Sequence, residues 1–341
     1  MGVFELEQTK VDLDGNRSSR IIVNVEPPVQ AKSLAGVGAN AYLVQFCQPL
    51  SNTALGHVNK LLMKFQDLTL RIYSSYPEPS QFRTLQFLHQ LPDVKNLSLS
   101  LPQLTDLKGI EPVIEKLEFL DLPFPRTTPS NLELISHAQS LSRLCTDDRR
   151  VLKLAPRPDR LTEIRCSGTR SDFESFVPDL LNLDSLKLSQ VKGEAVSKLS
   201  VSPTLRHFKL SLCRGDTDLR FIEKLKNLET LDLHRVDVNS WPDFRKLTGL
   251  RAIHLHSAFS GFELEFLNHL PQLEEVVLHE WPTIRIDALK TSNIFDRVRS
   301  FRYAFGKGLR ACSQDREFAE LFSRAEHSHS CLLRYFNDLG Y

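Results

Sequence analysis

The 341-residue sequence contains no apolar run of the roughly 20 residues that a membrane-spanning helix needs. Its first ten residues include Glu5 and Glu7 and lack a basic stretch followed by an apolar one, so no secretory signal is visible. Position 6 is Leu6 and not Ser or Thr, which excludes the myristoylation pattern that begins at Gly2. We therefore expect a cytoplasmic protein that does not contact membranes.

The sequence also lacks cysteine pairs and a charge excess. Its six cysteines form no CxxC motif and no paired framework, which indicates free thiols in a reducing compartment. The formal net charge is +1, so no global attraction to nucleic acid or anionic lipid is expected.

Motifs for catalysis and cofactor binding are weak. Residues 36–41 match a loose dinucleotide pattern, but no acidic residue follows about 20 positions later, and Gly306-Lys307-Gly308 lacks the rest of a phosphate-binding loop. No cofactor and no enzymatic activity are predicted from these segments.

The dominant pattern is a triplet of apolar residues that lie three and then two positions apart. Ten triplets recur, and their first members are spaced by 20 to 25 residues. The triplets are Val94-Leu97-Leu99, Leu117-Leu120-Leu122, Leu141-Leu144-Thr146, Leu161-Ile164-Cys166, Leu183-Leu186-Leu188, Leu205-Phe208-Leu210, Leu228-Leu231-Leu233, Leu250-Ile253-Leu255, Leu273-Val276-Leu278 and Val298-Phe301-Tyr303. This period predicts a solenoid in which each repeat packs only on its neighbours.

The residues between triplets predict how the chain returns from one strand to the next. Apolar residues recur there at every third position, as in Phe244, Leu247 and Leu250. Three residues per turn suits a 3₁₀ or short helix whose apolar edge packs on the strands. Each repeat is therefore predicted to be a strand, a turn and a helical return.

These repeats resemble the leucine-rich repeat family over roughly residues 85 to 305, and their length is similar to the 22-residue subclass of bacterial internalins and of a phosphatase-binding regulatory subunit. The resemblance implies an α/β solenoid with a curved parallel β-sheet on the concave side and 3₁₀ or short helices on the convex side. The family usually has Asn three residues after the last Leu of the triplet. Here that place is occupied by Val191, Cys213, Val236, Ala258 and Trp281.

Three segments are predicted: an N-terminal β/α cap over residues 1–80, the leucine-rich repeat array over 81–305 and a C-terminal helical cap over 306–341. Alternating residues on both sides of Asp14-Gly15 predict a short antiparallel sheet, and residues 54–65 have helical spacing. Phe65-Leu68-Leu70 fits the triplet as an irregular first repeat. Residues 315–325 and 330–339 are amphipathic and predict two helices that close the far end.

The triplets also predict which side chains lie on the concave face. The last two members point into the core, so the residue between them and the residue after them point outward together. From Arg165 onward, the in-between position continues as Lys187, Lys209, Asp232, His254, Val277 and Arg302. The following position is Ser167, Ser189, Ser211, His234, His256, His279 and Ala304. Phe119, Arg143, His207 and Thr230 lie one step earlier on their strands and widen the face.

Two rows on this face suggest chemistry. Arg165, Lys187 and Lys209 form a row of like charges that destabilises a sheet unless something negative offsets it. His234, His256 and His279 form a second row, which suits a shared metal ion or a pH-sensitive surface. For both rows, a solvated polar face without a partner is the alternative.

The sequence therefore predicts a non-enzymatic module that binds a protein partner with an acidic surface, such as an enzyme or toxin, in the role of an inhibitor, an immunity-type protein or an adaptor. One alternative is a metal-dependent or pH-sensitive protein that uses the concave histidines. The other is a nucleic-acid binder that adds Arg297, Arg299, Arg302 and Arg310 to the basic row, which the near-neutral charge disfavours. The predicted partner-binding residues are Arg143, Arg165, Ser167, Lys187, Ser189, His207, Lys209, Ser211, Asp232, His234, His254, His256, His279 and Arg302.

Overall fold

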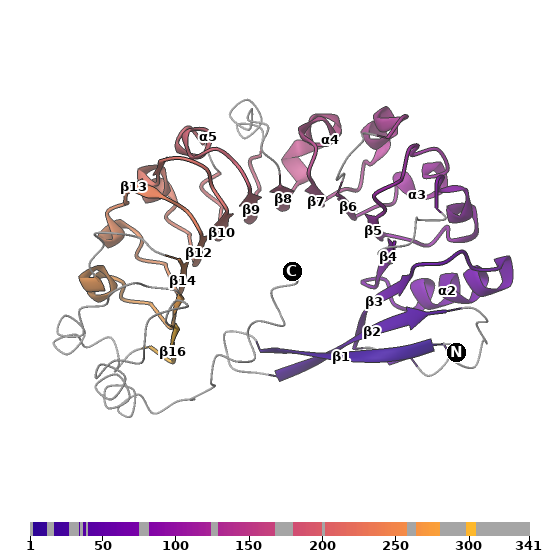
Figure 1. Ribbon diagram of the computed structural model, residues 1–341, viewed down its shortest axis with the longest axis horizontal. Coiled ribbons are helices and arrows are strands. Elements are labelled where there is room, and N and C mark those ends of the chain that lie inside the picture. Colours follow the sequence, from indigo (N-terminus) through magenta and orange to yellow (C-terminus); the bar gives the residue numbers. More distant parts are fainter. Residues whose placement is uncertain are drawn as a thin grey trace. The chain divides into compact units, whose positions relative to one another are not determined.

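The computed structural model describes residues 3–11, 17–26, 34, 37–38, 40–74, 82–123, 129–167, 180–199, 202–257, 264–279 and 298–304. The chain divides into two compact units, Met1–Ser167 and Gly168–Tyr341. We call these unit 1 and unit 2. Within each unit the helical segments lie on one side of a sheet, and we call the other side of that sheet the strand face (Figure 1).

Unit 1 contains a sheet whose strands follow one another in chain order. Strand β1 (Val3–Val11) pairs antiparallel with β2 (Arg17–Val25), and every later neighbour is parallel. The later strands are β3 (Ala41–Phe46), β4 (Thr69–Tyr73), β5 (Asn96–Ser100), β6 (Phe119–Leu122), β7 (Arg143–Thr146) and β8 (Glu163–Ser167). The helical segments are α2 (Asn52–Lys64), η1 (Gln86–Gln90), α3 (Glu111–Ile114), η2 (Leu132–His137), α4 (Arg149–Leu154) and η3 (Pro158–Arg160).

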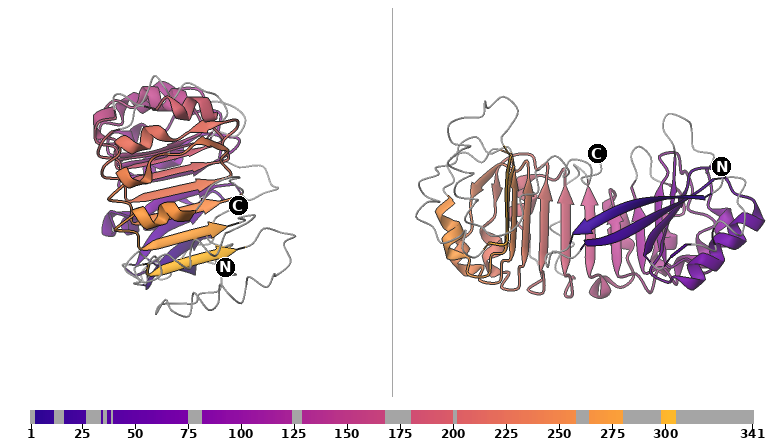
Figure 2. Two further views of the ribbon diagram at one scale, coloured as in Figure 1. Left: turned by 90° about the vertical axis from the view of Figure 1, so that its left-hand side faces the viewer. Right: turned by 90° about the horizontal axis from the view of Figure 1, so that it is seen from below.

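Unit 2 repeats the arrangement of parallel strands joined by helical returns, and its strands run parallel in Figure 2. The main strands are β9 (Ser185–Ser189), β10 (His207–Ser211), β12 (Thr230–His234), β14 (Ala252–His256), β15 (Glu275–His279) and β16 (Ser300–Ala304). The helical segments are α5 (Gly193–Ser197), η6 (Arg220–Lys224), η7 (Phe244–Lys246) and η8 (Leu264–His269). A small second sheet pairs β11 (Thr217–Asp218) with β13 (Val238–Ser240).

All ten triplets occupy the same place in the repeat. In each, the strand begins two residues after the first member, as β12 begins at Thr230 after Leu228. Neighbouring strands align the triplets in register, for example Leu231 with Ile253 and Leu233 with Leu255. Every triplet member whose burial is described is at most 6% exposed. The predicted leucine-rich repeat solenoid is confirmed, because each repeat buries its triplet against the next.

The predicted 3₁₀ returns are also present. In η6, the amide of Leu225 donates to the carbonyl of Ile222 (2.9 Å), and the amide of Leu228 donates to that of Leu225 (3.1 Å). The same three-residue step joins Leu247 to Phe244 and Leu250 to Leu247. Each return therefore closes its own backbone hydrogen bonds while it buries one apolar side chain per turn.

The turn after each strand in unit 2 is held without the family's Asn. Its first residue is left-handed at Gln190, Leu212, Arg235 and Ser257, with φ between 51° and 71°. The amide of each donates to a carbonyl on the next strand, as that of Leu212 does to His234 at 2.7 Å. Val191, Cys213 and Val236 fill the Asn place and are buried, whereas Ala258 and Trp281 lie outside the described residues. Backbone amides therefore replace the side-chain amide ladder.

The N-terminal predictions hold with one shift in register. The antiparallel sheet and the helix α2 are both present, and the Ser51 hydroxyl caps α2 by accepting from the Ala54 amide (3.2 Å). Strand β4 aligns Leu70 with Leu97 and Ile72 with Leu99, so its core pair begins two residues later than the Phe65-Leu68-Leu70 triplet predicts. Phe65 instead ends α2. The helices predicted at 315–325 and 330–339 lie outside the described residues.

Candidate protein-binding face

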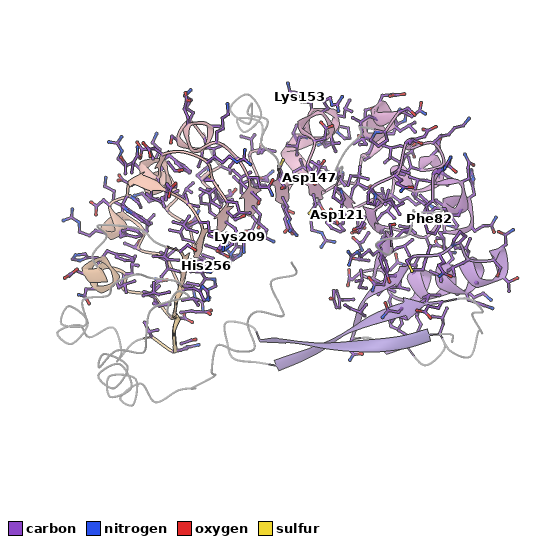
Figure 3. The ribbon with its side chains drawn as sticks, viewed as in Figure 1. Phe82, Asp121, Asp147, Lys153, Lys209 and His256 are labelled. Atoms are coloured by element: carbon purple, nitrogen blue, oxygen red, sulfur yellow. The ribbon has the colours of Figure 1, made fainter. Side chains whose placement is uncertain are left out.

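The strand face of unit 2 presents the two predicted rows in register. Successive strands align Lys187, Lys209, Asp232, His254, Val277 and Arg302. One position later they align Ser189, Ser211, His234, His256, His279 and Ala304. Figure 3 shows Lys209 and His256 on this side of unit 2. Along β9, β10, β12, β14 and β15, strand alternation therefore places these side chains on one face, although the placement alone does not assign them a role.

The predicted row of like charges is interrupted. The Lys209 ammonium lies 2.8 Å from the Asp232 carboxylate on the neighbouring strand, so its charge is offset within the row. Lys187 lies opposite Lys209 on β9. Arg165 belongs to β8 in unit 1, as Ser167 does, and lies near Asp121 and Asp147 there. The cations are therefore parts of two mixed-charge surfaces, one in each unit.

Three histidines lie next to one another across β12, β14 and β15. The rings of His234 and His256 have centroids 4.0 Å apart and planes 12° apart, and those of His256 and His279 are 4.1 Å and 56° apart. We call these residues the histidine ladder. The first pair is therefore stacked and the second is tilted. Among the described residues, no three His, Cys, Asp or Glu side chains are placed to hold a metal ion.

The other predicted residues make local contacts. His207 lies 3.1 Å from the Thr230 hydroxyl, measured from Nδ1, and His254 lies 3.5 Å from Glu275, measured from Nε2. Arg143, in unit 1, donates to the side-chain oxygen of Asn96 (2.8 Å) and covers the Phe119 ring at 5.0 Å. The Ser211 hydroxyl donates to the carbonyl of Leu188 (3.4 Å). Arg143 is thus held by its own unit, and His207 and His254 each contact a side chain of the strand face of unit 2.

A second charged feature, which the sequence reasoning missed, runs along the edge where the strands of unit 2 begin. The residue just before each strand alternates in sign, as Asp184, Arg206, Glu229, Arg251, Glu274 and Arg299. Arg206 lies 2.7 Å from Glu229, whose hydrogen bond raises the pKa of Arg206. Arg251 lies 2.8 Å from Glu274, and Arg299 lies 3.6 Å from it. We call this the edge charge ladder, and its charges largely neutralise one another.

The edge charge ladder also bears on the nucleic-acid hypothesis. Arg299, one of the arginines that this hypothesis needs, lies 3.6 Å from the Glu274 carboxylate, which offsets its charge. Arg297 and Arg310 lie outside the described residues.

The strand face of unit 1 carries buried acidity that the sequence reasoning also missed. Burial raises the pKa of Asp121 despite a hydrogen bond from the Ser98 hydroxyl (2.7 Å) and the nearby charge of Arg165. Burial and the charge of Asp121 raise the pKa of Asp147. Both carboxylates are labelled on this face in Figure 3, with Lys153 on the helical side. Ser98 and Asp121 occupy the in-between position of the Val94 and Leu117 triplets, so the rule used from Arg165 onward would have found them.

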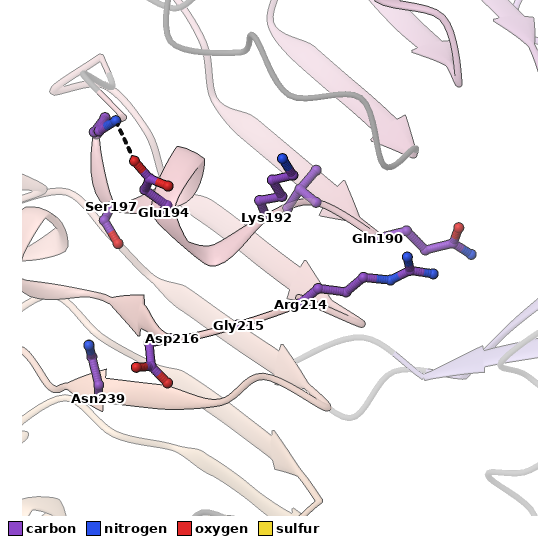
Figure 4. A pocket seen from close by; sticks show the side chains of 10 residues that line it. Gln190, Lys192, Glu194, Ser197, Arg214, Gly215, Asp216 and Asn239 are labelled. Carbon is purple, nitrogen blue, oxygen red and sulfur yellow. Dashed lines mark hydrogen bonds and ion pairs between the residues drawn. The ribbon is translucent and has the colours of Figure 1, made fainter.

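A hollow of about 670 Å³ lies in unit 2 beside α5 and β11 rather than on the strand face (Figure 4). Its lining includes Lys192 and Arg214, whose backbones pair as an isolated parallel β-bridge. Asp216 and Asn239 also line it. The lining mixes both charges, so it shows no preference for the charge of a ligand.

Two further observations concern the helices and the thiols. Within the described ranges, no helix has the length and apolar character that crossing a bilayer would require. Cys166 and Cys213 are buried and free of disulfide bonds, and burial raises the pKa of the Cys213 thiol to about 11. These two thiols are therefore protonated and unreactive at neutral pH.

Comparison of the sequence with protein-family models and with curated proteins gives no match. Among solved structures, the chain is similar to an internalin of Listeria monocytogenes, with 13% identity, a TM-score of 0.44, and coverage of 77% of this chain and 80% of that one. It is also similar to a leucine-rich repeat protein of Leptospira interrogans, with 15% identity, a TM-score of 0.41, and coverage of 85% and 90%.

A third similar structure is that of the Toll–Spatzle complex of Drosophila, with 12% identity, a TM-score of 0.47, and coverage of 83% of this chain and 43% of that one. The fold itself rests on this chain's own register: ten triplets in parallel strands, each buried against the next.

Proposed function

We propose that this protein is a non-enzymatic, cytoplasmic module that binds an acidic surface of a protein partner on the strand face of unit 2, as an inhibitor, an immunity-type protein or an adaptor. The observation that supports this proposal is the composition of that face. Five of the 11 histidines and two lysines lie on its strands, at positions that alternate with the last two buried members of each triplet. A preformed sheet also loses little conformational entropy when a partner binds, so ordering of the protein opposes binding only weakly.

The arrangement suits recognition better than catalysis. Side chains in register on a flat sheet offer many contacts spread over a surface, which is what a protein partner needs. A catalytic group, in contrast, needs neighbours that converge on one reacting atom. His234 stacks on His256, His279 is tilted against His256, and the Lys209 ammonium is directed to Asp232. The buried, reduced Cys166 and Cys213 fit the cytoplasm.

The test reverses charge on the strand face and maps the bound partner. Lys187→Glu combined with Lys209→Glu is expected to weaken partner binding about tenfold or more, because it replaces attraction to acidic side chains with repulsion. The matched control is Lys224→Glu combined with Lys226→Glu, which makes the same charge change at exposed positions on the helical side. Circular dichroism verifies that both variants are folded.

The partner is first captured with the full chain, and its affinity is then measured by calorimetry. Amide hydrogen exchange of the complex is expected to show protection on β10, β12 and β14. Protection confined to helical segments, or equal affinities of the two double variants, would refute the proposed face.

A further inference from the structure

The edge charge ladder of unit 2 is evenly spaced and held by the backbone. Its six residues are Asp184, Arg206, Glu229, Arg251, Glu274 and Arg299. The amide of each donates to the carbonyl of the ladder residue before it, at 2.8–2.9 Å in every step. Neighbouring strands lie about 4.8 Å apart, so the charges follow one another at that spacing along the edge. The row of alternating charge is therefore preformed and does not have to be ordered when something binds to it.

Alternation over an even number of positions makes the ladder complementary to itself. A two-fold axis that is perpendicular to the sheet and passes between Glu229 and Arg251 reverses the order of the residues in a second copy. The facing pairs are then Asp184 with Arg299, Arg206 with Glu274, and Glu229 with Arg251, and each pair occurs twice. Every pair is of opposite sign. A shift by one repeat would place like charges opposite each other, so the charges also select the register.

The ion pairs within one copy leave the charged groups accessible. Arg206 lies 2.7 Å from Glu229, yet the side chain of Arg206 is 49% exposed. The side chains of Asp184 and Arg299, at the two ends of the ladder, are 42% and 59% exposed. A guanidinium can donate to several acceptors, and a carboxylate can accept from several donors. An opposite charge from a second copy therefore adds to the pairs within the copy and does not compete with them.

Apolar turn residues lie at the same edge. Three positions before the ladder residue, the chain turns toward the strand, and the turn residues there include Leu181, Pro203 and Pro271. All three are exposed, and Leu181, at 63%, is one of two exposed large apolar residues in the described ranges. The reversed order that pairs Arg206 with Glu274 also places Pro203 opposite Pro271. One register therefore matches apolar residues as well as charges, which pairing within a single copy does not require.

We propose that the edge charge ladder is a self-recognition surface, through which unit 2 binds unit 2 of a second copy of this chain in the reversed register. Charge complementarity specifies the occupant, because the sequence of charges that the ladder needs is its own. The axis is perpendicular to the sheet, so the strand faces of both copies point to the same side. The contact therefore goes beyond the proposed function and does not depend on it. A ladder about 24 Å long forms an interface at the small end of the range, so the association is weak and sensitive to salt.

Sedimentation equilibrium of the full chain tests the association at protein concentrations up to about 0.5 mM, where a contact with a Kd near about 0.1 mM is measurable. We expect a reversible monomer–dimer equilibrium at low salt that shifts to monomer as salt is added, because screening weakens charge contacts. A chain that is monomeric over the whole range at low salt, or a dimer that salt does not weaken, overturns the proposal.

Two charge-reversed variants test the ladder itself. Glu229→Lys with Glu274→Lys makes the edge cationic, and Arg206→Glu with Arg251→Glu makes it acidic. Each variant alone is expected to self-associate about tenfold or more weakly than the natural chain, whereas an equimolar mixture of the two should dimerise, because the reversed register then sets cations against acids. The matched control, Glu133→Lys with Glu265→Lys, changes exposed residues of helical segments and should still dimerise. Circular dichroism verifies the fold of each variant, and a folded mixture that stays monomeric overturns the proposal.

A cross-linking test keeps the ladder intact, in case like charges along one edge prevent folding. A chain with Pro203→Cys is mixed with a chain with Pro271→Cys at low salt, with oxygen as the oxidant, and the disulfides are mapped by mass spectrometry of peptides. We expect the 203–271 disulfide in clear excess over the 203–203 and 271–271 disulfides. A random distribution of the three, or none of them, overturns the register. Either result leaves the proposed function standing, because a partner on the strand face is measured separately.

Discussion

Glu274 offers a sharp test of the edge charge ladder, because it holds two arginines at once. Its carboxylate lies 2.8 Å from the guanidinium of Arg251 and 3.6 Å from that of Arg299, and its side chain is only 20% exposed. A single exposed ion pair stabilises a protein by roughly 0.2–1 kcal/mol. Glu274→Gln removes both attractions and keeps the side-chain size, so we expect the free energy of unfolding to fall by about 1–2 kcal/mol at low salt.

A charge swap distinguishes a ladder from isolated pairs. In an isolated pair, Arg251→Glu with Glu274→Arg would restore the attraction. In the ladder, the new arginine faces Arg299 and the new glutamate lies next to Glu229 across the strand edge. We therefore expect the swapped variant to stay less stable than the natural chain by about 1–2 kcal/mol. Adding Arg299→Glu should recover part of the loss.

The assay is urea unfolding followed by circular dichroism, at low and at high salt. The destabilisation should shrink at high salt, because screening weakens charge interactions at exposed sites. The control swaps the Arg157–Asp159 pair in unit 1, whose two side chains are both about half exposed, and should leave the midpoint unchanged. A 251/274 swap that restores full stability would refute the ladder and leave a simple pair.

Three further predictions concern stability. Burial raises the pKa of Asp121, so this carboxyl keeps its proton to a higher pH in the folded state than in the unfolded state. The ionised carboxylate therefore destabilises the fold at neutral pH, and this destabilisation is lost as the pH falls through the pKa of the folded state. The Asp121→Asn variant should therefore have a higher free energy of unfolding than the natural chain at neutral pH. Urea unfolding at successively lower pH should show this difference shrinking by at most about 1.4 kcal/mol per pH unit. Gly193→Ala should lower the free energy of unfolding by about 3 kcal/mol, because the added Cβ would collide with the carbonyl oxygen of Asp216. An unchanged midpoint in urea unfolding would contradict this close packing. Arg235 has φ 51°, a left-handed backbone conformation that favours glycine, so Arg235→Gly should be neutral or raise the free energy of unfolding by up to about 1 kcal/mol. Arg235→Val should lower it by about 1–2 kcal/mol. A reversed order of the two unfolding midpoints would exclude strain at this turn.

The register of the repeats was predictable, with one exception that shows the limit of pattern reading. Phe65, Leu68 and Leu70 have the triplet spacing, yet the strand of that repeat buries Leu70 and Ile72. The spacing alone cannot tell the end of a helix from the start of a strand, and here Phe65 ends α2. In the other repeats the turn before the strand is short, so the first apolar residue has only one place to lie.

Membership of the candidate face was predictable, but its interactions were not. Alternation along a strand assigns Lys209, Asp232 and the histidines to one surface. It does not say whether a lysine extends into solvent or reaches its neighbour, because both are low-energy conformations of the same side chain. The 2.8 Å Lys209–Asp232 pair and the 12° stack of His234 on His256 are choices among such conformations.

The sequence by itself determined the fold, because a period near 22 residues with buried triplets leaves one way to remove the apolar side chains from water. It also determined which residues share the strand face, since each strand alternates its side chains. Only the tertiary structure decided which of these charges cancel and which remain. That decision depends on residues about 23 positions apart in the chain that meet across neighbouring strands, where a few ångströms separate a neutral pair from an exposed charge.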